Sequence, residues 1–331
     1  MTAFRAQVGY STPMNVPAPG SAALLVALAV VLPQPAAPGP PQTDARTLVA
    51  ERVKTVGRTS VWTSVSARPV GFDTHHPQGM VRVGEALFVS SVEVTAPTRR
   101  FPAPVDGMDR DAGTGVGHLF KMDLQGRLLA RATIGEGTMY HPGGIDYDGR
   151  WIWASVAEYR PDSRSIVYRI DPDTLQATEV FRFRDHLGAI VHDRADSELH
   201  AVSWGSRRFH RWTLGTRGEV NPDAVRTSRN PSFYVDYQDC KFLGMRQMLC
   251  SGVTELRRPA DAVPFRLGGL DLVSLDDGRP LHQVPIALWT ASGLAMSQNP
   301  VWIEPNQSGG LRVYFMPEDN RSTLYIYDVG H

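Results

Sequence analysis

The stretch MYHPGGIDYDG, residues 139–149, decides the fold because near-copies of it occur twice more in the chain. THHPQGMVRVG at 74–84 and RDHLGAIVHDR at 184–194 also place a histidine before small residues and an alternating apolar segment. Alternation of apolar and polar residues is typical of a half-buried β-strand. A histidine that precedes a strand three times in one chain therefore indicates an internal repeat.

Length and composition limit the classes of protein to consider. The 331 residues are 42% hydrophobic, which is ample for a packed core, and single all-β domains often exceed about 250 residues. The 34 Lys and Arg residues balance 34 Asp and Glu residues. With no net charge there is no global field to attract nucleic acid or an anionic membrane, so we expect neither partner.

The N-terminal region differs from the rest of the chain. SAALLVALAVVL (21–32) is an uncharged apolar run that is too short to span a bilayer comfortably, and a Pro/Ala-rich segment follows it. We therefore predict a signal peptide and linker over 1–45, one domain over 46–331, and an exported protein without a stable membrane span after processing. An uncleaved N-terminal anchor, or a start assigned too far upstream, are the alternatives, because Arg5 is the only positive charge before the run.

The repeating unit is clearest from the quoted stretch onward. HPGGIDYDG, RWIWASVAEY, SIVYRIDPDT and LQATEVFRFRD form four strand-like segments separated by turn residues. The turn after the third segment recurs in LFKMDLQG (119–126), VYRIDPDT (167–174), LDLVSLDDG (270–278) and LYIYDVG (324–330). The aligned first segments start 65, 45, 52 and 60 residues apart, at His76, His141, His186, Gln238 and Gln298.

A four-stranded unit repeated at this spacing predicts an all-β fold, and specifically a β-propeller. The last unit lacks a fourth strand at the C-terminus, and SVWTSVSARPV (60–70) resembles the outer strands of the other units. We therefore expect the N-terminal strand to complete the C-terminal blade and to close the ring. Five blades is the favoured count, and six is the alternative if residues 215–236 hold further strands.

The first strand of every propeller blade lines the central axis and enters it from the same face. The five aligned starts would then form a ring of three imidazoles and two amides. The second strands return to that face, and four of them end in a glutamate: Glu93, Glu158, Glu255 and Glu318. The loops that follow add arginines, whose guanidinium groups bind carboxylates and phosphates in a bidentate manner.

These residues predict a metal-assisted site. Three converging neutral imidazoles suit Zn²⁺ or another divalent first-row metal, so His76, His141 and His186 are the predicted ligands. Glu93 and Glu158 are the candidate catalytic residues, as a general base or as groups that orient the imidazoles. The predicted substrate-binding residues are Arg100, Arg160, Arg207, Trp204, Gln238 and Gln298.

A purely structural interpretation stands beside this one. The histidines and glutamines would form a plug that hydrogen-bonds internally and to trapped water. The glutamates would pair with the loop arginines and join neighbouring blades. The other histidines, including His75 and His118, have no equivalent in the other repeats, and we expect them to be ordinary surface or core residues.

The two cysteines lie in DCKFLGMRQMLC, at Cys240 and Cys250. If this segment is a hairpin that turns at 244–246, the two residues face each other across its strands. A cross-strand disulfide then fits an exported protein, and two buried free thiols are the alternative.

The segments VGHLF (116–120), GEGTMYHPGGIDYDGR (135–150), VAEYRPDSR (156–164), IVYRID (166–171) and SWGSR (203–207) resemble a family of exported bacterial proteins of unknown function, over roughly residues 60–330. At the level of fold the chain resembles the lactonase-like propellers of the gluconolactonase and strictosidine-synthase group, and five-bladed arabinan-degrading hydrolases. The first group uses a Glu/Asn/Asp metal site, whereas this ring is rich in His and Gln. Carotenoid-cleaving propellers use axial histidines but have more blades and a fourth histidine. The resemblance therefore implies the fold and no particular activity.

The resulting hypothesis is an exported, monomeric propeller with a His-lined axial pocket. It would act as a metal-assisted hydrolase or lyase-like enzyme on a small anionic or polar molecule. The alternative is a non-catalytic ligand-binding or scaffold propeller with a His/Gln plug.

Overall fold

A computed structural model describes residues 44–257 and 264–330. The predicted signal peptide and linker therefore lie outside the described residues up to position 43. Asp44 caps helix α1 (Ala45–Val53), which packs against β16 and β20 and buries Val49 and Val53 in the core. In the described ranges, no helix has the length and apolar character needed to cross a membrane.

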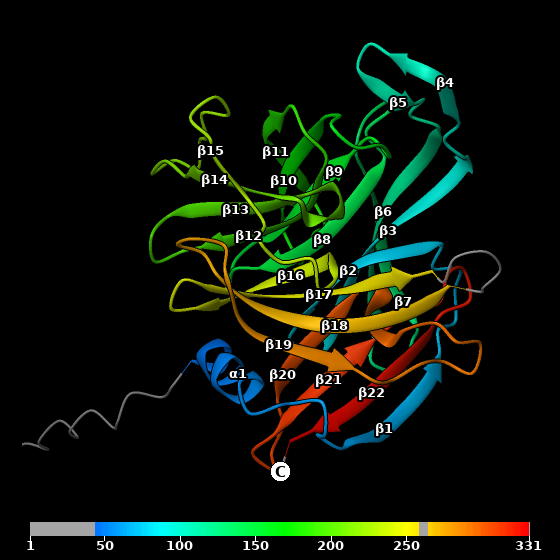
Figure 1. Ribbon diagram of the computed structural model, residues 1–331, viewed down its shortest axis with the longest axis vertical. Coiled ribbons are helices and arrows are strands. Elements are labelled where there is room, and N and C mark those ends of the chain that lie inside the picture. Colours follow the sequence, from blue (N-terminus) through cyan, green and yellow to red (C-terminus); the bar gives the residue numbers. More distant parts are fainter. Residues whose placement is uncertain (1–43, 258–263, 331) are drawn as a thin grey trace, which may run out of the picture. The chain divides into compact units, whose positions relative to one another are not determined.

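Apart from α1 and two short 3-10 helices, the regular structure consists of strands, so the all-β prediction is confirmed (Figure 1). The strands form successive four-stranded antiparallel units in chain order. The first four units are β2 (His76–Val83), β3 (Ala86–Ala96), β6 (Thr114–Asp123) and β7 (Leu128–Ile134); β8 (His141–Tyr147), β9 (Ile152–Ala157), β10 (Ser165–Ile170) and β11 (Ala177–Phe183); β12 (Leu187–Asp193), β13 (Glu198–Ser203), β14 (Arg208–Thr213) and β15 (Arg226–Arg229); and β16 (Asp236–Gly244), β17 (Gln247–Leu256), β18 (Phe265–Ser274) and β19 (Pro280–Ile286).

The last unit joins the two ends of the described chain. Its sheet order is β20 (Val301–Pro305), β21 (Leu311–Phe315), β22 (Thr323–Val329) and β1 (Trp62–Pro69). β1 pairs antiparallel with β22, with Ala67 opposite Tyr325. The expected closure by the N-terminal strand is therefore observed, and Figure 1 shows the blue β1 beside the red β22.

The expected separation into five independent sheets is not observed. β8 and β12 are joined by a parallel pairing at Gly144 and Ala189, so their two units form one eight-stranded sheet. The cause is the small residues of the repeated motif, which allow a very close approach. A Cβ on Gly143 would lie 2.1 Å from the carbonyl oxygen of Gly188, and one on Gly79 would lie 2.5 Å from the backbone nitrogen of Ile145.

Four shorter elements complete the fold. The long loop that follows β3 contains a small hairpin. One 3-10 helix follows β13, and the other precedes β20. Their bounds are β4 (Arg100–Val105), β5 (Met108–Arg110), η1 (Trp204–Ser206) and η2 (Met296–Gln298).

A buried carboxylate binds the innermost strands to one another. Asp239 of β16 accepts hydrogen bonds from the backbone N–H groups of Met80 on β2 (2.9 Å) and Ile145 on β8 (3.2 Å), and a longer one from Val301 on β20 (3.4 Å). Lys241 pairs with this carboxylate and also donates to the carbonyl oxygen of Ile145 at 2.6 Å. Burial raises the pKa of Asp239 to about 6, against the opposing effect of Lys241.

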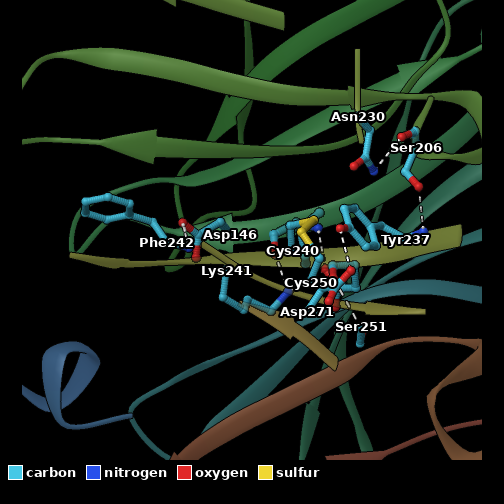
Figure 2. The surroundings of a disulfide bond; sticks show 12 residues. Asp146, Ser206, Asn230, Tyr237, Cys240, Lys241, Phe242, Cys250, Ser251 and Asp271 are labelled. Carbon is cyan, nitrogen blue, oxygen red and sulfur yellow. Dashed lines mark hydrogen bonds and ion pairs between the residues drawn. A yellow bond between two sulfur atoms is a disulfide. The ribbon is translucent and has the colours of Figure 1, made fainter. Parts of the chain in front are cut away.

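The β16–β17 hairpin turns through Met245 and Arg246 at positive φ and places Cys240 opposite Cys250. The two residues form a disulfide with a Cα–Cα distance of 4.1 Å, and both are buried (Figure 2). The disulfide alternative therefore describes this structure. The link lies in the same hairpin as Asp239 and Lys241, next to the centre of the fold.

Replacing Gly143 by alanine tests the close approach of β8 and β12. The added Cβ would meet the backbone of Gly188, which cannot move as a flexible side chain can. We expect Gly143→Ala to lower the free energy of unfolding by about 3 kcal/mol or more, or to prevent folding. Gly57→Ala is the control, because nothing lies within 4 Å of its added Cβ. Equal urea midpoints for the two variants would contradict the explanation.

Removing the buried ammonium tests the pair at the centre. Lys241→Met leaves the Asp239 carboxylate buried without its counter-charge, and we expect a loss of about 3–5 kcal/mol in unfolding free energy. The double variant Asp239→Asn/Lys241→Met contains no buried charge and should recover part of that loss. Urea unfolding of the two variants gives the comparison, and a double variant less stable than Lys241→Met would refute this account.

Candidate functional site

The three predicted histidines lie together at the starts of neighbouring inner strands. His76 opens β2, His141 opens β8, and His186 immediately precedes β12. The ring centroids of His76 and His141 are 6.4 Å apart, and those of His141 and His186 are 5.5 Å apart. The repeated motif therefore places the three imidazoles next to one another, as the sequence predicts.

These imidazoles line a pocket of about 440 Å³, which we call the central pocket. Gln238 of β16 and Gln298 of η2 line it as well, so all five aligned motif positions meet there. Trp204 of η1 forms another wall and packs edge-on against His186, with ring centroids 4.7 Å apart.

His141 has the most unusual environment of the three. Its ring stacks on Tyr159 with centroids 4.1 Å apart, and both ring nitrogens are buried without a hydrogen-bond partner. Burial, followed by the neighbouring His186 and His76, holds the pKa of His141 well below its ordinary value. The imidazole is therefore neutral, with one nitrogen protonated and the other offering a lone pair.

The other two imidazoles are oriented by partners on Nδ1. His186 Nδ1 lies 2.8 Å from the carbonyl oxygen of Glu158. Because a carbonyl oxygen only accepts, Nδ1 carries the proton and Nε2 keeps its lone pair. Burial lowers the pKa of His186 to about 4, so the ring is neutral at physiological pH.

His76 Nδ1 contacts Oδ1 of Asp319 at 2.7 Å. Burial alone would raise the pKa of Asp319, but the hydrogen bond from His76 holds that pKa below its ordinary value. Asp319 is therefore ionised and accepts from Nδ1. The sequence analysis missed Asp319, which lies one residue beyond the aligned Glu318.

The four aligned glutamates do reach the same face, but they differ in what they contact. Glu255 lines the central pocket and pairs with Arg257 at 2.6 Å. Glu318 accepts from the hydroxyl of Tyr325 at 2.7 Å. Glu93 faces two histidines rather than an arginine.

Glu158, one of the two candidate catalytic residues, does not line the central pocket. Its side chain is 1% exposed and accepts from Thr138 (2.6 Å), Arg160 (2.7 Å) and Arg164 (2.8 Å). Burial by itself would raise its pKa, but these three donors hold the pKa below its ordinary value. Glu158 is thus a bound carboxylate, and only its backbone carbonyl contacts the pocket histidines.

The predicted substrate-binding arginines are also engaged elsewhere. Arg160 bonds Glu158 and the backbone of Arg110, Arg207 pairs with Asp236 at 2.5 Å, and Arg100 is exposed on the β4 strand. Within the described part of the chain none of them lines the central pocket, whereas Arg266 of β18 does. The sequence did not distinguish substrate binding from pairing with an acid, whether that acid lies two residues away, as for Arg160, or on a distant segment, as for Arg207.

A second group of side chains lies beside the central pocket. His75, Glu93 and His118, the rim group, have ligand atoms that all lie within 4.8 Å of one another. In the described ranges it is the one set of at least three His, Cys, Asp or Glu residues that meets this limit, so the three central imidazoles stand farther apart. The expectation that His75 and His118 are ordinary surface or core residues did not include their shared neighbour, Glu93.

The rim group is only partly exposed to solvent. Burial lowers the pKa of His118 despite the opposing hydrogen bond to Glu93. A neighbouring pocket of about 340 Å³ is lined by His75, Glu93, His76, Tyr159 and Asp319. We call it the rim pocket; its last three residues also line the central pocket.

The described fold and site define an all-β protein with a histidine-lined central pocket. The chain belongs to the DUF6454 family, a family of unknown function, whose model matches residues 36–330. No curated protein matches the chain.

Several solved structures are similar to this chain over most of its length. A luciferin-regenerating enzyme is 10% identical with a TM-score of 0.47, over 82% of this chain and 95% of that one. A bifunctional GH43-CE protein of Bacteroides eggerthii is 13% identical with a TM-score of 0.49, over 78% of this chain and 34% of that one. A DUF4623 family protein from Bacteroides eggerthii DSM 20697 is 10% identical with a TM-score of 0.42, over 83% and 78%. Likeness at this level carries no information on activity.

The contacts of Glu158 predict a structural effect on mutation. Glu158→Ala removes the acceptor of two arginines and one threonine, and we expect a loss of about 2–4 kcal/mol in unfolding free energy at pH 7. Because the folded pKa is lowered, this stabilisation is present above about pH 4.5 and is lost as the pH falls further. The deficit of the variant should shrink in acid, while replacing the exposed Glu51 of α1 by alanine should change the stability little. A deficit independent of pH would count against this assignment.

Proposed function

We propose that the protein is an exported five-bladed β-propeller that hydrolyses a small polar molecule in the central pocket, assisted by a divalent metal bound to His76, His141 and His186. The single observation that carries this proposal is His141. Leaving a buried polar group without a partner costs about 1–3 kcal/mol, and here both ring nitrogens are in that state. A ligand of the pocket would recover this cost.

The propeller is supported by the sheet topology. Five four-stranded units follow one another along the chain, the last is completed by β1, and each contributes its first strand to the centre. The pairing of β8 with β12 joins two units without changing this order. Export is supported by the signal-peptide pattern and by the disulfide, which persists in oxidising compartments.

The metal is supported by the arrangement of lone pairs. Asp319 and the carbonyl of Glu158 occupy Nδ1 of His76 and His186, which leaves Nε2 of each ring available. Histidine ligands of metals are commonly held by such partners on their second nitrogen. His141 is neutral and lies between the two rings.

The ring distances show what metal binding would require. Two imidazoles on one tetrahedral Zn²⁺ have ring centroids about 5 Å apart, given Zn–N distances of about 2.0–2.1 Å. The 5.5 Å between His141 and His186 is close to this value, and the 6.4 Å between His76 and His141 exceeds it by roughly 1 Å. His76 would therefore move inward on binding.

The lining of the pocket favours a polar substrate. Gln238, Asn299 and Arg266 provide amide and guanidinium groups, while Tyr159 and Trp204 provide flat apolar surfaces. Asp236 also lines the pocket, and burial raises its pKa against the effect of Arg207. A carboxyl group with a raised pKa is suited to proton transfer.

A non-catalytic plug is the second candidate, and one observation favours it. Gln298 donates to the carbonyl oxygen of Pro317 at 2.8 Å and accepts a long bond from Arg266, so this amide is satisfied within the protein. The volume of the central pocket argues against a plug, because a plug would fill the centre with side chains.

Replacing His141 by phenylalanine tests the proposed function. The aromatic stack on Tyr159 is kept, and the two nitrogens are removed. We expect the chelator-treated variant to bind Zn²⁺ or Mn²⁺ at the central pocket at least about 100-fold more weakly, and to lose metal-dependent hydrolysis of a panel of aryl esters and lactones. Calorimetric titration and a spectrophotometric assay measure the two effects.

His282→Gln is the matched control, since this histidine lines neither the central nor the rim pocket. Wild-type protein that neither binds metal nor hydrolyses any member of the panel would rule out the enzyme. Unchanged binding and turnover in His141→Phe would remove His141 from the mechanism.

A further inference from the structure

We propose that His75, Glu93 and His118 form a second metal site, which binds a divalent first-row cation, preferably Zn²⁺, and opens toward the rim pocket. This inference does not depend on the function proposed for the central pocket. It starts from three ligand atoms that meet without any rearrangement of the backbone.

The distances fit a tetrahedral ion. Oε2 of Glu93 lies 3.1 Å from Nε2 of His118 and 3.7 Å from Nε2 of His75. Ligand atoms at about 2.0–2.1 Å from a tetrahedral Zn²⁺ are about 3.3–3.4 Å apart. The two observed distances bracket this value, and all three ligand atoms lie within 4.8 Å of one another.

The two rings stack, at the separation expected of neighbouring ligands. Their centroids are 5.0 Å apart and their planes differ by 16°, whereas two imidazoles on one tetrahedral ion have centroids about 5 Å apart. Phe120 lies beside both rings, at 6.3 Å from His75 and 5.3 Å from His118. An apolar wall on one side limits solvent access to the group.

Each ligand is placed by a specific backbone feature. His118 on β6 pairs with Ser91 on β3, so Glu93, two residues further along β3, lies on the same face as a diagonal neighbour of His118. His75 has φ = 51°, which is uncommon for a residue other than glycine. This conformation is held by Asp73, which accepts from the N–H of His75, and by Asn320, which donates to its carbonyl.

The strained conformation of His75 gives two consecutive histidines separate roles. His75 and His76 both line the rim pocket, but His75 faces Glu93 and His76 faces Asp319. Backbone strain of this kind tends to occur at functional sites. Here it brings the His75 imidazole to a carboxylate that already accepts from His118.

The chemistry of the donors defines the cation. Two imidazoles and one carboxylate suit Zn²⁺ and similar first-row ions, and they disfavour Ca²⁺ or Mg²⁺, which prefer oxygen ligands. A site with three protein ligands leaves one position open for water or substrate. That position faces the rim pocket, because His75 and Glu93 line it.

Metal titration of the full-length protein after treatment with a chelator tests this site. Glu93→Gln keeps the size of the side chain and removes its charge. His75→Asn removes the imidazole but suits a positive φ, since Asn adopts that conformation more readily than most residues. We expect each variant to bind Zn²⁺ at the rim site at least about 100-fold more weakly than wild type, with Glu51→Gln as the control. Thermal unfolding in excess chelator shows whether each variant is folded.

The Co²⁺ absorption spectrum separates this site from the central pocket. His141→Phe should leave the rim-site bands unchanged, whereas Glu93→Gln should remove them and keep any signal from the central pocket. Wild-type protein without a Zn²⁺ site of at least micromolar affinity would overturn the proposal. Binding that survives both Glu93→Gln and His75→Asn would overturn it as well.

Discussion

The centre of this protein depends on one buried carboxylate. Asp239 binds backbone N–H groups of β2, β8 and, more weakly, β20, so strands from three other units are fixed to the first strand of the fourth. Lys241 compensates the charge and adds a further bond to β8. N–H groups of inner strands that meet at a centre cannot all be paired within their own sheets, and a carboxylate with several lone pairs can satisfy more than one of them.

The same constraint explains the repeated motif. Strands that approach the centre closely need small residues, because a Cβ on Gly144 would lie 2.7 Å from both Cα and Oδ1 of Asp239. The histidine that precedes these glycines lies where the strands diverge and a pocket opens. Glycine and histidine therefore recur together for one geometric reason: the first permits the closest approach, and the second lies at the edge of the space beyond it.

The sequence predicts the fold better than the site. Local patterns predict the four-stranded repeat and the unit that β1 and β22 share. The alignment of the repeats predicts the pocket histidines. The joining of β8 to β12 was not predicted, because the small residues of the motif permit a close approach at several inner strands and do not show which of them pair. Glu158 looked equivalent to Glu93, but arginines two and six residues further on bind it. His75 was missed because its role depends on a positive φ, and His118 because its partner is reached only across the β3–β6 register.

The two groups of histidines differ in the hydrogen bonds that a metal ion would have to replace. In the rim group, Glu93 accepts a hydrogen bond from Nε2 of His118. A cation that binds both of these atoms must replace the proton that lies between them. In the central pocket, His141 has no interaction to lose, whereas its neighbours are fixed through Nδ1 by Asp319 and Glu158. The possible ligand atoms of the rim group therefore lie closer to one another. The ring nitrogens of the central pocket have more lone pairs that no hydrogen bond occupies. His76, Tyr159 and Asp319 line both pockets, so the two groups of histidines lie side by side with common walls while each keeps its own set of ligand atoms.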